Sequence, residues 1–500
     1  MRERPAESVP RLARTALAAA ALCSALGCDG RTGLTFVPDA SVEIIPDAGP
    51  DAGPGAGPDA GSPDAGPAPL TLRAGAARIE LVPAAGSPLA GFGAAPRRLI
   101  NAVTIPEQLA AANGQCLDLD PSTAATYFAP NQGTLDPLYV RALVIDDGAR
   151  RMAILKVDAI GFSREIRDDL LPLAASLGIP PELLVGAATH THSGAGAVSR
   201  ALIWELIAAD CFNARAYAVF LDTMKRALAA AVHNLAEARL GAGAAQDTSA
   251  SENRRGRPGV FDPEMGILKL IDAEGKTIAA VMNFAIHGTV HGADNLKFSA
   301  DVMGQAELLV EEKLGGMALF LNGAEGDVRP AHGLDSGRML AETLAAAWPA
   351  IATSSHTELQ GAFEDVTMPR LQYNVGCVPI PGSGGTLCDL LPGVSVQVPL
   401  DPAWAPKKGP FQAIRLGDTV LAMVPGEPIT ELGWEIKARG AAQGFAHTFV
   451  VGLANDHLSY FTTRAEYLRG LYEGTASLYG PGNGALVVDA AERVMIRARR

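Results

Sequence analysis

The sequence has few basic residues relative to acidic ones. Its 500 residues include 41 Lys and Arg against 54 Asp and Glu, a formal net charge of -13 at pH 7. Because phosphate binding requires a basic surface, this balance argues against a nucleic-acid partner. Hydrophobic residues make up 48% of the chain, which is ample for a packed core. The composition therefore favours a folded protein with a small-molecule or lipid substrate.

Cysteine is scarce, and no two cysteines have the CxxC spacing of a thiolate zinc site. Four of the six cysteines lie beyond the N-terminal region: Cys116, Cys211, Cys377 and Cys388. The last two flank a loop rich in Gly and Pro, which suits a local disulfide in an exported chain. Pairing of Cys116 with Cys211 is the natural remainder, although the sequence does not establish the connectivity.

The N-terminus has the features of a secretory signal. Several arginines precede an apolar run over residues 15–27 that is too short to span a bilayer comfortably, and Cys28 follows directly. The ending SALGC is similar to a bacterial lipoprotein processing site, so residues 1–28 are expected to be a signal peptide that ends in a lipid-anchored cysteine. Ordinary signal cleavage nearby is the alternative, and either route exports the protein.

Residues 29–69 are expected to form a disordered tether. The stretch PDAGPDAGPGAGPDAGSPDAGPAP, residues 46–69, cannot bury apolar area and should stay extended and solvated. Such a tether would hold the folded part away from a membrane to which Cys28 is anchored.

Residues 70–500 are expected to form one large α/β domain with mixed β-sheets flanked by helices. Several candidate strands are almost continuously apolar, as in strands that are covered on both faces. They span residues 142–147, 152–159, 183–189, 266–272, 279–285 and 317–323. A turn at Glu274 and Gly275 predicts a hairpin between the fourth and fifth of these strands. The apolar spacing over residues 301–314 is helical.

Polar clusters recur just after three of the candidate strands. They read THTHSGAG, HGTVHG and NGAEGD, and two of them hold four of the nine histidines. The strand ends of α/β proteins commonly carry ligand sites, so we expect the active site in these loops.

His190 and His192 admit two interpretations. Residues two apart in a strand point to the same side, so both imidazoles could converge on one pocket. They could equally bond only to backbone at a strand end. His287 and His291 are four apart, but Gly288 and Gly292 favour a loop, and no HExxH glutamate is present.

Beyond these local features, the sequence resembles the neutral/alkaline, non-lysosomal ceramidase family. The matching blocks follow the family order from about residue 74 to residue 480. They include AGAARIELVPAAGSPLAGFG, DPLYVRALVIDDG, ATHTHSGAG, SENRRG, NFAIHGTVHG, VPGEPITELG and GLANDHLSYFTTRAEYLRGLYEG.

The resemblance implies a catalytic zinc ion with four protein ligands. At the matching positions these are His190, His287, Glu427 and Tyr460. It also implies active-site roles for three further residues, which are His192 for proton transfer, Arg254 near the reacting carbonyl, and Tyr472. Asp301 and Asp327 are candidates to orient the histidines or to bind substrate hydroxyls, and caps or turns are an equally good interpretation.

The sequence departs from the family at one catalytic position. The family segment Gly-Asp-x-Ser-Pro-Asn carries a serine assigned to catalysis, and here the segment reads GDVRPA with Arg329 in its place. A guanidinium pointing into the pocket would favour a substrate with a carboxylate or phosphate near the metal. The C-terminal immunoglobulin-like domain that is usual in the family is also expected to be absent.

The sequence thus predicts an exported zinc hydrolase that cleaves an N-acyl amide bond, of ceramide or a related substrate, with activated water. His192 would move the proton from the water to the leaving amine, and Arg254 would stabilise the oxyanion. The alternative is a surface lipoprotein that keeps the fold and binds a lipid or glycan without turnover. A purely structural metal is a remote third possibility, because closed structural sites favour cysteine.

Overall fold

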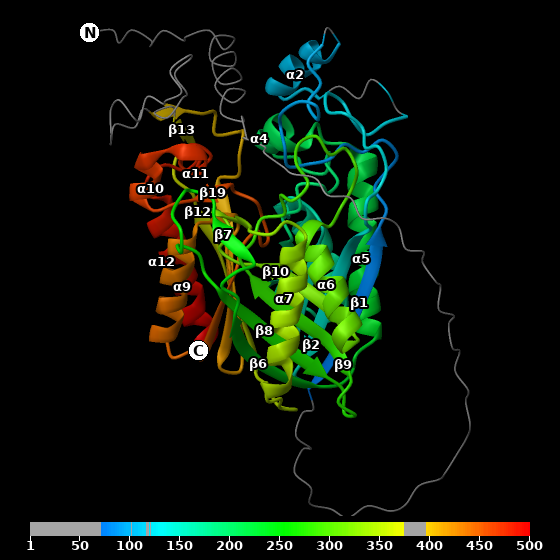
Figure 1. Cartoon of the computed structure of the whole chain (residues 1–500), viewed down its shortest axis with the longest axis vertical. Helices are drawn as coiled ribbons and strands as arrows, with labels where there is room; N and C mark the ends of the chain where they lie inside the picture. The colour runs from blue at the N-terminus through cyan, green and yellow to red at the C-terminus, as the bar shows by residue number, and fades with distance from the viewer. Residues whose placement is uncertain (1–71, 102, 117–119, 121, 375–396) are drawn as a thin grey trace, which may run out of the picture.

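Three β-sheets surround a shared apolar core in the computed structural model of the chain. The structure describes residues 72–374 and 397–500, apart from residues 102, 117–119 and 121. Each sheet turns one face to the shared core and the other to its own pair of helices. Figure 1 shows α6 and α7 over strands β8 and β10 on one side of the molecule, and α9 and α12 along the other.

The first sheet has the strand order β4-β3-β2-β1-β5 and is covered by α3 and α5. Strands β1, β2 and β3 are antiparallel neighbours, whereas β3 and β4 run parallel. The elements are β1 (Arg73–Leu81), β2 (Leu138–Asp146), β3 (Arg151–Val157), β4 (Leu184–Ala188), β5 (Ala236–Glu237), α3 (Arg164–Ser176) and α5 (Ala214–His233).

The second sheet has the order β10-β9-β8-β6 and is covered by α6 and α7. Strands β8 and β9 form the expected antiparallel hairpin, and β9 and β10 run parallel. The elements are β6 (Arg239–Gln246), β8 (Glu264–Ile271), β9 (Thr277–Phe284), β10 (Met317–Asn322), α6 (Asp301–Leu314) and α7 (Asp335–Ala347).

The third sheet has the order β12-β15-β16-β18 and is covered by α9 and α12. Strands β16 and β18 run parallel. The elements are β12 (Leu359–Thr367), β15 (Lys408–Leu416), β16 (Thr419–Met423), β18 (His447–Val451), α9 (Thr430–Ala442) and α12 (Asn483–Arg499).

Burial on both faces explains why the strands read as continuous apolar runs. In β10, Leu319 and Leu321 pack into the shared core, while Ala318 and Phe320 pack under α6 and α7. All six predicted strands and the helix over residues 301–314 are present. The predicted α/β class with mixed, helix-flanked sheets is therefore confirmed.

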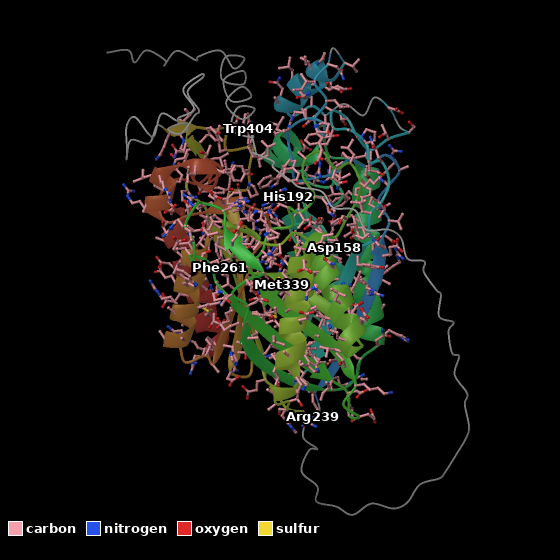
Figure 2. All side chains as sticks on the ribbon, in the orientation of Figure 1. Asp158, His192, Arg239, Phe261, Met339 and Trp404 are labelled. Carbon is pink, nitrogen blue, oxygen red and sulfur yellow. A yellow bond between two sulfur atoms is a disulfide. The ribbon has the colours of Figure 1, made fainter. Side chains whose placement is uncertain are left out.

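Each sheet contains one β-α-β unit with a parallel strand pair: β3-α3-β4, β9-α6-β10 and β16-α9-β18. The loops that follow these six strands meet at one end of the sheets. Backbone hydrogen bonds between the sheets lie at this end. Gly452 N donates to the Asn322 carbonyl at 3.0 Å, and Asn455 N donates to the Gly186 carbonyl at 2.8 Å. In the view of Figure 2, His192 lies toward the end of the molecule that carries Trp404, whereas Arg239 lies at the other end.

Short elements complete these loops. Strand β11 pairs with β7, β17 with β19, and β13 with β14. The bounds are β7 (Ser251–Asn253), β11 (Val328–Pro330), β13 (Gln372–Asn374), β14 (Gln397–Pro399), β17 (Glu427–Pro428), β19 (Tyr460–Phe461), α2 (Thr104–Ala112), α4 (Leu202–Trp204), α10 (Arg464–Arg469) and α11 (Leu471–Thr475).

Cys116 and Cys211 form a disulfide, as expected. The expected Cys377–Cys388 bond lies outside the described residues. Within the part of the chain that the structure describes, no helix is both long and apolar enough to cross a membrane.

Candidate metal and active site

Four loops bring the predicted site residues together. His190 follows β4, His287 follows β9, Glu427 opens β17 after β16, and Tyr460 opens β19 after β18. All four side chains are at least 96% buried. His190 has a φ of 69°, a left-handed conformation that is costly for a residue other than glycine and is typical of functional sites.

Backbone carbonyls fix the orientation of both imidazoles. His190 Nδ1 lies 2.6 Å from the Ile160 carbonyl, and His287 Nδ1 lies 2.8 Å from that of Glu325. Because a carbonyl oxygen only accepts, each Nδ1 carries the proton and each Nε2 keeps its lone pair. Both rings are therefore prepared as neutral donors to a metal ion through Nε2. Burial and the charge of Arg254 lower the pKa of His287 to about 3, which favours this neutral form.

The donor atoms are spaced like the ligands of one metal ion. Glu427 Oε2 lies 3.3 Å from His190 Nε2 and 3.4 Å from His287 Nε2, and Tyr460 Oη lies 3.1 Å from His287 Nε2. A tetrahedral ion with bonds of about 2.0–2.1 Å separates its ligand atoms by about 3.3 Å. These three separations therefore fit ligands of one metal ion.

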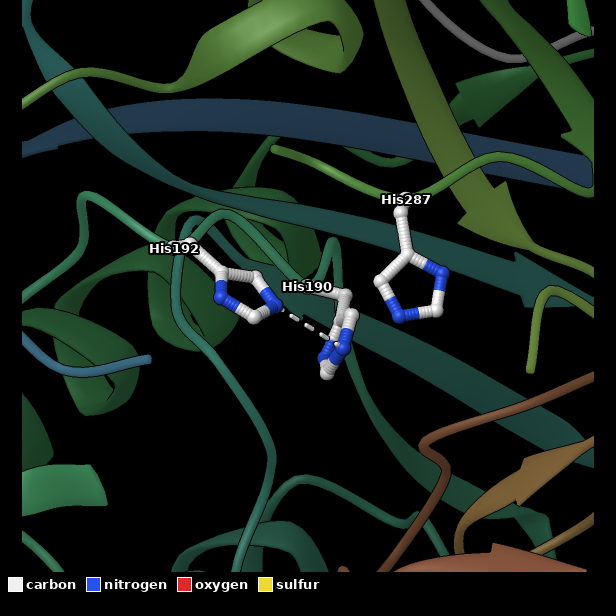
Figure 3. Close-up of side chains that lie close together, drawn as sticks. All are labelled: His190, His192 and His287. Carbon is white, nitrogen blue, oxygen red and sulfur yellow. Dashed lines mark hydrogen bonds between the residues drawn. The ribbon is translucent and has the colours of Figure 1, made fainter. Parts of the chain in front are cut away.

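His192 lies beside this group of ligands. Its Nε2 is 3.3 Å from His190 Nε2 (Figure 3), and the ring packs against Phe92. His190, His192 and His287 also form a compact trio of possible metal donors. Burial and the neighbouring His190 hold the pKa of His192 well below its usual value, so the ring is neutral at pH 7. Its Nδ1 has no hydrogen-bond partner among the described residues.

The predicted convergence of His190 and His192 occurs, but not for the predicted reason. Both residues lie beyond the end of β4, and the left-handed turn at His190 brings the rings together rather than strand alternation. His287 and His291 lie in a loop, as the glycines indicated.

Arg254 borders the metal-ligand group from the strand pair β7 and β11. It donates to the Tyr460 hydroxyl at 3.0 Å, to the Gly326 carbonyl at 2.8 Å and to Glu473 at 2.8 Å. Burial raises the pKa of the Tyr460 phenol well above its usual value, so a phenolate there needs cations beside it. Arg254 supplies one such cation. Tyr472 is 37% exposed and its ring lies edge-on to that of Tyr460, so it stands at the outer side of the group.

His457 also contacts the metal-ligand group, although the sequence pattern did not predict it. This buried residue lies three positions before Tyr460, and its Nε2 is 2.9 Å from Glu427 Oε1. With His190 and Glu427 it makes a second compact group of possible donors. Its place inside the block that carries Tyr460 was the available signal.

The two aspartates hold loops rather than imidazoles. Asp301 accepts from the backbone of the 290–291 turn and of Val302, and Asp327 accepts from Thr430 and Asn253. The interpretation as turn and cap residues is therefore the correct one. Near Asp327, burial raises the pKa of Glu325 well above its usual value, and the carboxyl oxygens of Glu325 have no partner within the described chain.

The prediction that Arg329 points into the pocket and favours an anionic substrate is wrong. Its side chain is 56% exposed and forms an ion pair at 2.8 Å with Glu252, its partner across the β11–β7 strand pair. Its neighbour Val328 is the buried residue of this strand, and the Val328 carbonyl lies 3.0 Å from His287 Nδ1. Because side chains alternate along a strand, Arg329 points outward. A preference for anionic substrates therefore has no basis in this residue.

Arg329→Ser is accordingly expected to leave metal affinity and substrate preference within about 2-fold of the parent protein. The Arg329–Glu252 pair is exposed, and such pairs contribute about 0–1 kcal/mol to stability. The measurement is hydrolysis of neutral and anionic N-acyl substrates by both proteins, with zinc content as a second readout. If Arg329→Ser lost activity on the anionic substrates alone, Arg329 would contact the substrate after all.

A narrow cavity of about 40 Å³ lies beside the site, on the side of α3 and α4. Apolar side chains dominate its walls, with Phe162, Ile166, Val198 and Trp204 among them, and His457 lies at its inner end. Asp456 also lines it, accepting from the His457 backbone N–H at 2.8 Å through Oδ1.

Asp456 should make the protein less stable as the pH rises. Burial raises the pKa of Asp456 to about 7, whereas an unfolded aspartate titrates near pH 4. The protonated group stabilises the fold in full below about pH 4, and this stabilisation is lost as the pH rises to 7. The free energy of unfolding should fall by up to about 4 kcal/mol over this range. Asp456→Asn cannot ionise, so its stability relative to the parent should increase between pH 4.5 and pH 8 in urea unfolding. Parallel curves for Asp456→Asn and the parent would contradict the assignment.

Comparison with known proteins agrees with this geometry. The family model of the neutral/alkaline non-lysosomal ceramidases, N-terminal region, matches residues 125–333 and 390–488. The match covers more than half of the chain, so the chain belongs to this family.

Among the relatives of this chain are neutral ceramidases. The neutral ceramidase of Pseudomonas aeruginosa is 27% identical to this chain over an alignment of 399 residues, which covers 63% of this chain and 59% of the relative. The chain thus spans about three fifths of that protein. The enzyme of Drosophila melanogaster is 34% identical over 97 residues, 18% of this chain and 14% of its own.

Solved structures share the fold. The P. aeruginosa neutral ceramidase superposes with a TM-score of 0.69 at 22% identity, covering 86% of this chain and 75% of that one. A ceramidase complexed with C2 gives a TM-score of 0.70 at 21% identity, with the same coverage.

Proposed function

We propose that this protein is a zinc-dependent amidohydrolase that cleaves the amide bond of ceramide or a related N-acyl lipid. The observation that carries the proposal is the buried donor set of His190, His287, Glu427 and Tyr460, in which three separations of 3.1–3.4 Å suit ligands of one metal ion. Two neutral imidazoles, a carboxylate and a phenolate are hard-to-borderline donors that suit zinc.

A zinc ion held here would polarise the substrate carbonyl and lower the pKa of water toward neutrality. Protein side chains would transfer the proton and stabilise the oxyanion. His192 is neutral at pH 7, so it can accept the proton of the attacking water and deliver it to the leaving amine. Arg254 is held in place by Glu473 and the Gly326 carbonyl, and its fixed positive charge faces the side where the oxyanion would develop.

The walls of the small cavity beside the site suit an apolar group. Its walls are mainly apolar, and it ends at His457 next to Glu427. At about 40 Å³ the cavity is too small for a whole acyl chain. A small apolar group of the substrate placed there would leave water, at about 0.8 kcal/mol per buried CH₂.

Hydrolysis by activated water needs no serine, so Arg329 does not argue against turnover. The competing view is a protein that binds a lipid or glycan without cleaving it. We favour the enzyme because a binding protein has no need of His192 and Arg254 beside a metal site.

The test is zinc content and product release by the purified protein. Zinc per chain is measured together with fatty-acid release from ceramide, from other N-acyl amides and from esters, each compared with His190→Ala. Zinc-dependent cleavage of ceramide supports the proposal in full, and cleavage of another amide changes only the substrate. Bound zinc without turnover on any substrate would favour the binding protein, and absence of zinc would refute the metal site.

We further propose export and anchoring through Cys28. The support is the sequence of residues 1–28 and the tether-like composition of residues 29–69. Mass spectrometry of the mature N-terminus tests this: a diacylated Cys28 is expected, and Cys28→Ser should release the protein from membranes. A mature N-terminus at another residue would contradict the anchor.

A further inference from the structure

His457 is held in a fixed orientation by contacts on several sides. Its ring stacks on the indole of Trp204 with centroids 4.1 Å apart and planes 12° apart. Trp204 Nε1 donates to the His457 carbonyl at 2.8 Å, and Asp456 accepts from its backbone N–H. Gly161 lies so close that a Cβ there would be 2.5 Å from Nδ1. Two distant segments of the chain, at Gly161 and Trp204, therefore determine where Nε2 points together with the neighbouring Asp456.

The two oxygens of Glu427 have different partners. Oε1 lies 2.9 Å from His457 Nε2, whereas Oε2 lies 3.3 and 3.4 Å from the Nε2 atoms of His190 and His287. Oε2 accepts no hydrogen bond from any described residue. Because a carboxylate only accepts, His457 Nε2 is the donor of this bond.

We propose that His457 is a positioning residue that restricts Glu427 to one metal-facing oxygen. The inference deepens the proposed function and rests on it. A carboxylate with both oxygens free can swing into bidentate binding and take up the position that a catalytic metal site keeps open. Donation from His457 to Oε1 opposes that rotation, since binding through both oxygens would break the bond. Mutation of a residue that orients a metal ligand in this way typically lowers metal affinity or activity by about 10–100-fold.

The alternative role for His457 is that of a ligand. Its donor nitrogen lies within 4.8 Å of the donor nitrogen of His190 and of a carboxylate oxygen of Glu427. The geometry favours positioning, because Nε2 already faces Oε1 and Gly161 closes off Nδ1.

The experiment compares His457→Gln, which can still donate through its amide, with His457→Leu, which cannot. The exposed His233→Leu serves as the matched control, and Trp204→Phe removes the indole donor while keeping an aromatic ring. Each full-length protein is measured for zinc affinity by chelator competition, for the visible spectrum of its cobalt(II) form, and for its melting temperature.

The positioning role predicts distinct results for the variants. His457→Leu should bind zinc about 10–100-fold more weakly, and its cobalt bands should lose intensity as the second oxygen of Glu427 enters the coordination sphere. His457→Gln and His233→Leu should stay within about 3-fold of the parent with unchanged spectra, and Trp204→Phe should fall between. The spectrum separates positioning from a general loss of packing, which would lower the melting temperature without this change.

Three outcomes would overturn the inference. If His457→Leu keeps the parent affinity and spectrum, His457 does not position Glu427. If His457→Gln and His457→Leu both lose the metal, His457 is a ligand. If the parent protein binds no zinc, the proposed function fails together with this inference, whereas an active parent with unaffected variants refutes the inference alone.

Discussion

His287→Ala is expected to lose bound zinc and to lower kcat/KM by about 10³-fold or more. A catalytic metal supplies several kcal/mol of transition-state stabilisation, and about 4 kcal/mol corresponds to 10³-fold in rate. His287 has no exposed surface, and its Nε2 faces both Glu427 Oε2 and Tyr460 Oη. Its removal takes one donor from the set and leaves the Glu427 carboxylate with one fewer imidazole beside it.

His291→Ala is the matched control for this experiment. His291 lies in the same loop, four residues further on, and does not belong to either group of possible metal donors found in the described chain. The His291→Ala variant should keep its zinc, and its activity should stay within about 3-fold of the parent. Zinc content, kcat/KM and melting temperature are measured for both variants and for parent protein treated with a chelator. Zinc should restore the chelated parent but not His287→Ala. A fully active, zinc-free His287→Ala protein would remove the metal from the mechanism.

Local sequence pattern was enough to predict the elements of the sheets. Runs such as MALFLN are apolar at every position because both faces of β10 are buried, and helix α6 has the residue range that its periodicity indicated. The grouping of polar clusters at strand ends also followed from sequence, since the parallel pairs bring their carboxyl ends to one side of the molecule.

Features that depend on pairing between distant segments could not be predicted. The outward direction of Arg329 follows from the pairing of β11 with β7, two three-residue strands that have too few residues for a recognisable alternation. The role of His457 follows from the contact of its loop with Trp204, which is 253 residues away. The carbonyl partners of His190 and His287 likewise come from other loops, and backbone acceptors leave no residue-type signal in a sequence.

Arg254→Gln is expected to lower kcat by about 10²–10³-fold with little change in KM. Removing one fixed donor that faces a developing oxyanion costs about 3–4 kcal/mol in other acyl-transfer sites. The charge of Arg254 is secure, because Tyr460 and Glu473 raise its pKa well above the usual value although burial opposes them. The effect should fall on kcat, since the negative charge exists only in the transition state and not in the bound amide.

Arg254→Lys should recover only part of the activity. Arg254 divides its donors between Glu473 on one side and the Gly326 carbonyl and Tyr460 hydroxyl on the other, and one ammonium cannot reproduce that planar arrangement. Arg257→Gln is the control, because Arg257 bonds to Glu431 and Glu466 rather than to the metal-ligand group. Steady-state kinetics and zinc content are compared for the three variants. Equal kcat values for Arg254→Gln and Arg257→Gln would assign oxyanion stabilisation to the metal alone, whereas loss of zinc from Arg254→Gln would show that Arg254 acts mainly by stabilising Tyr460 as a ligand.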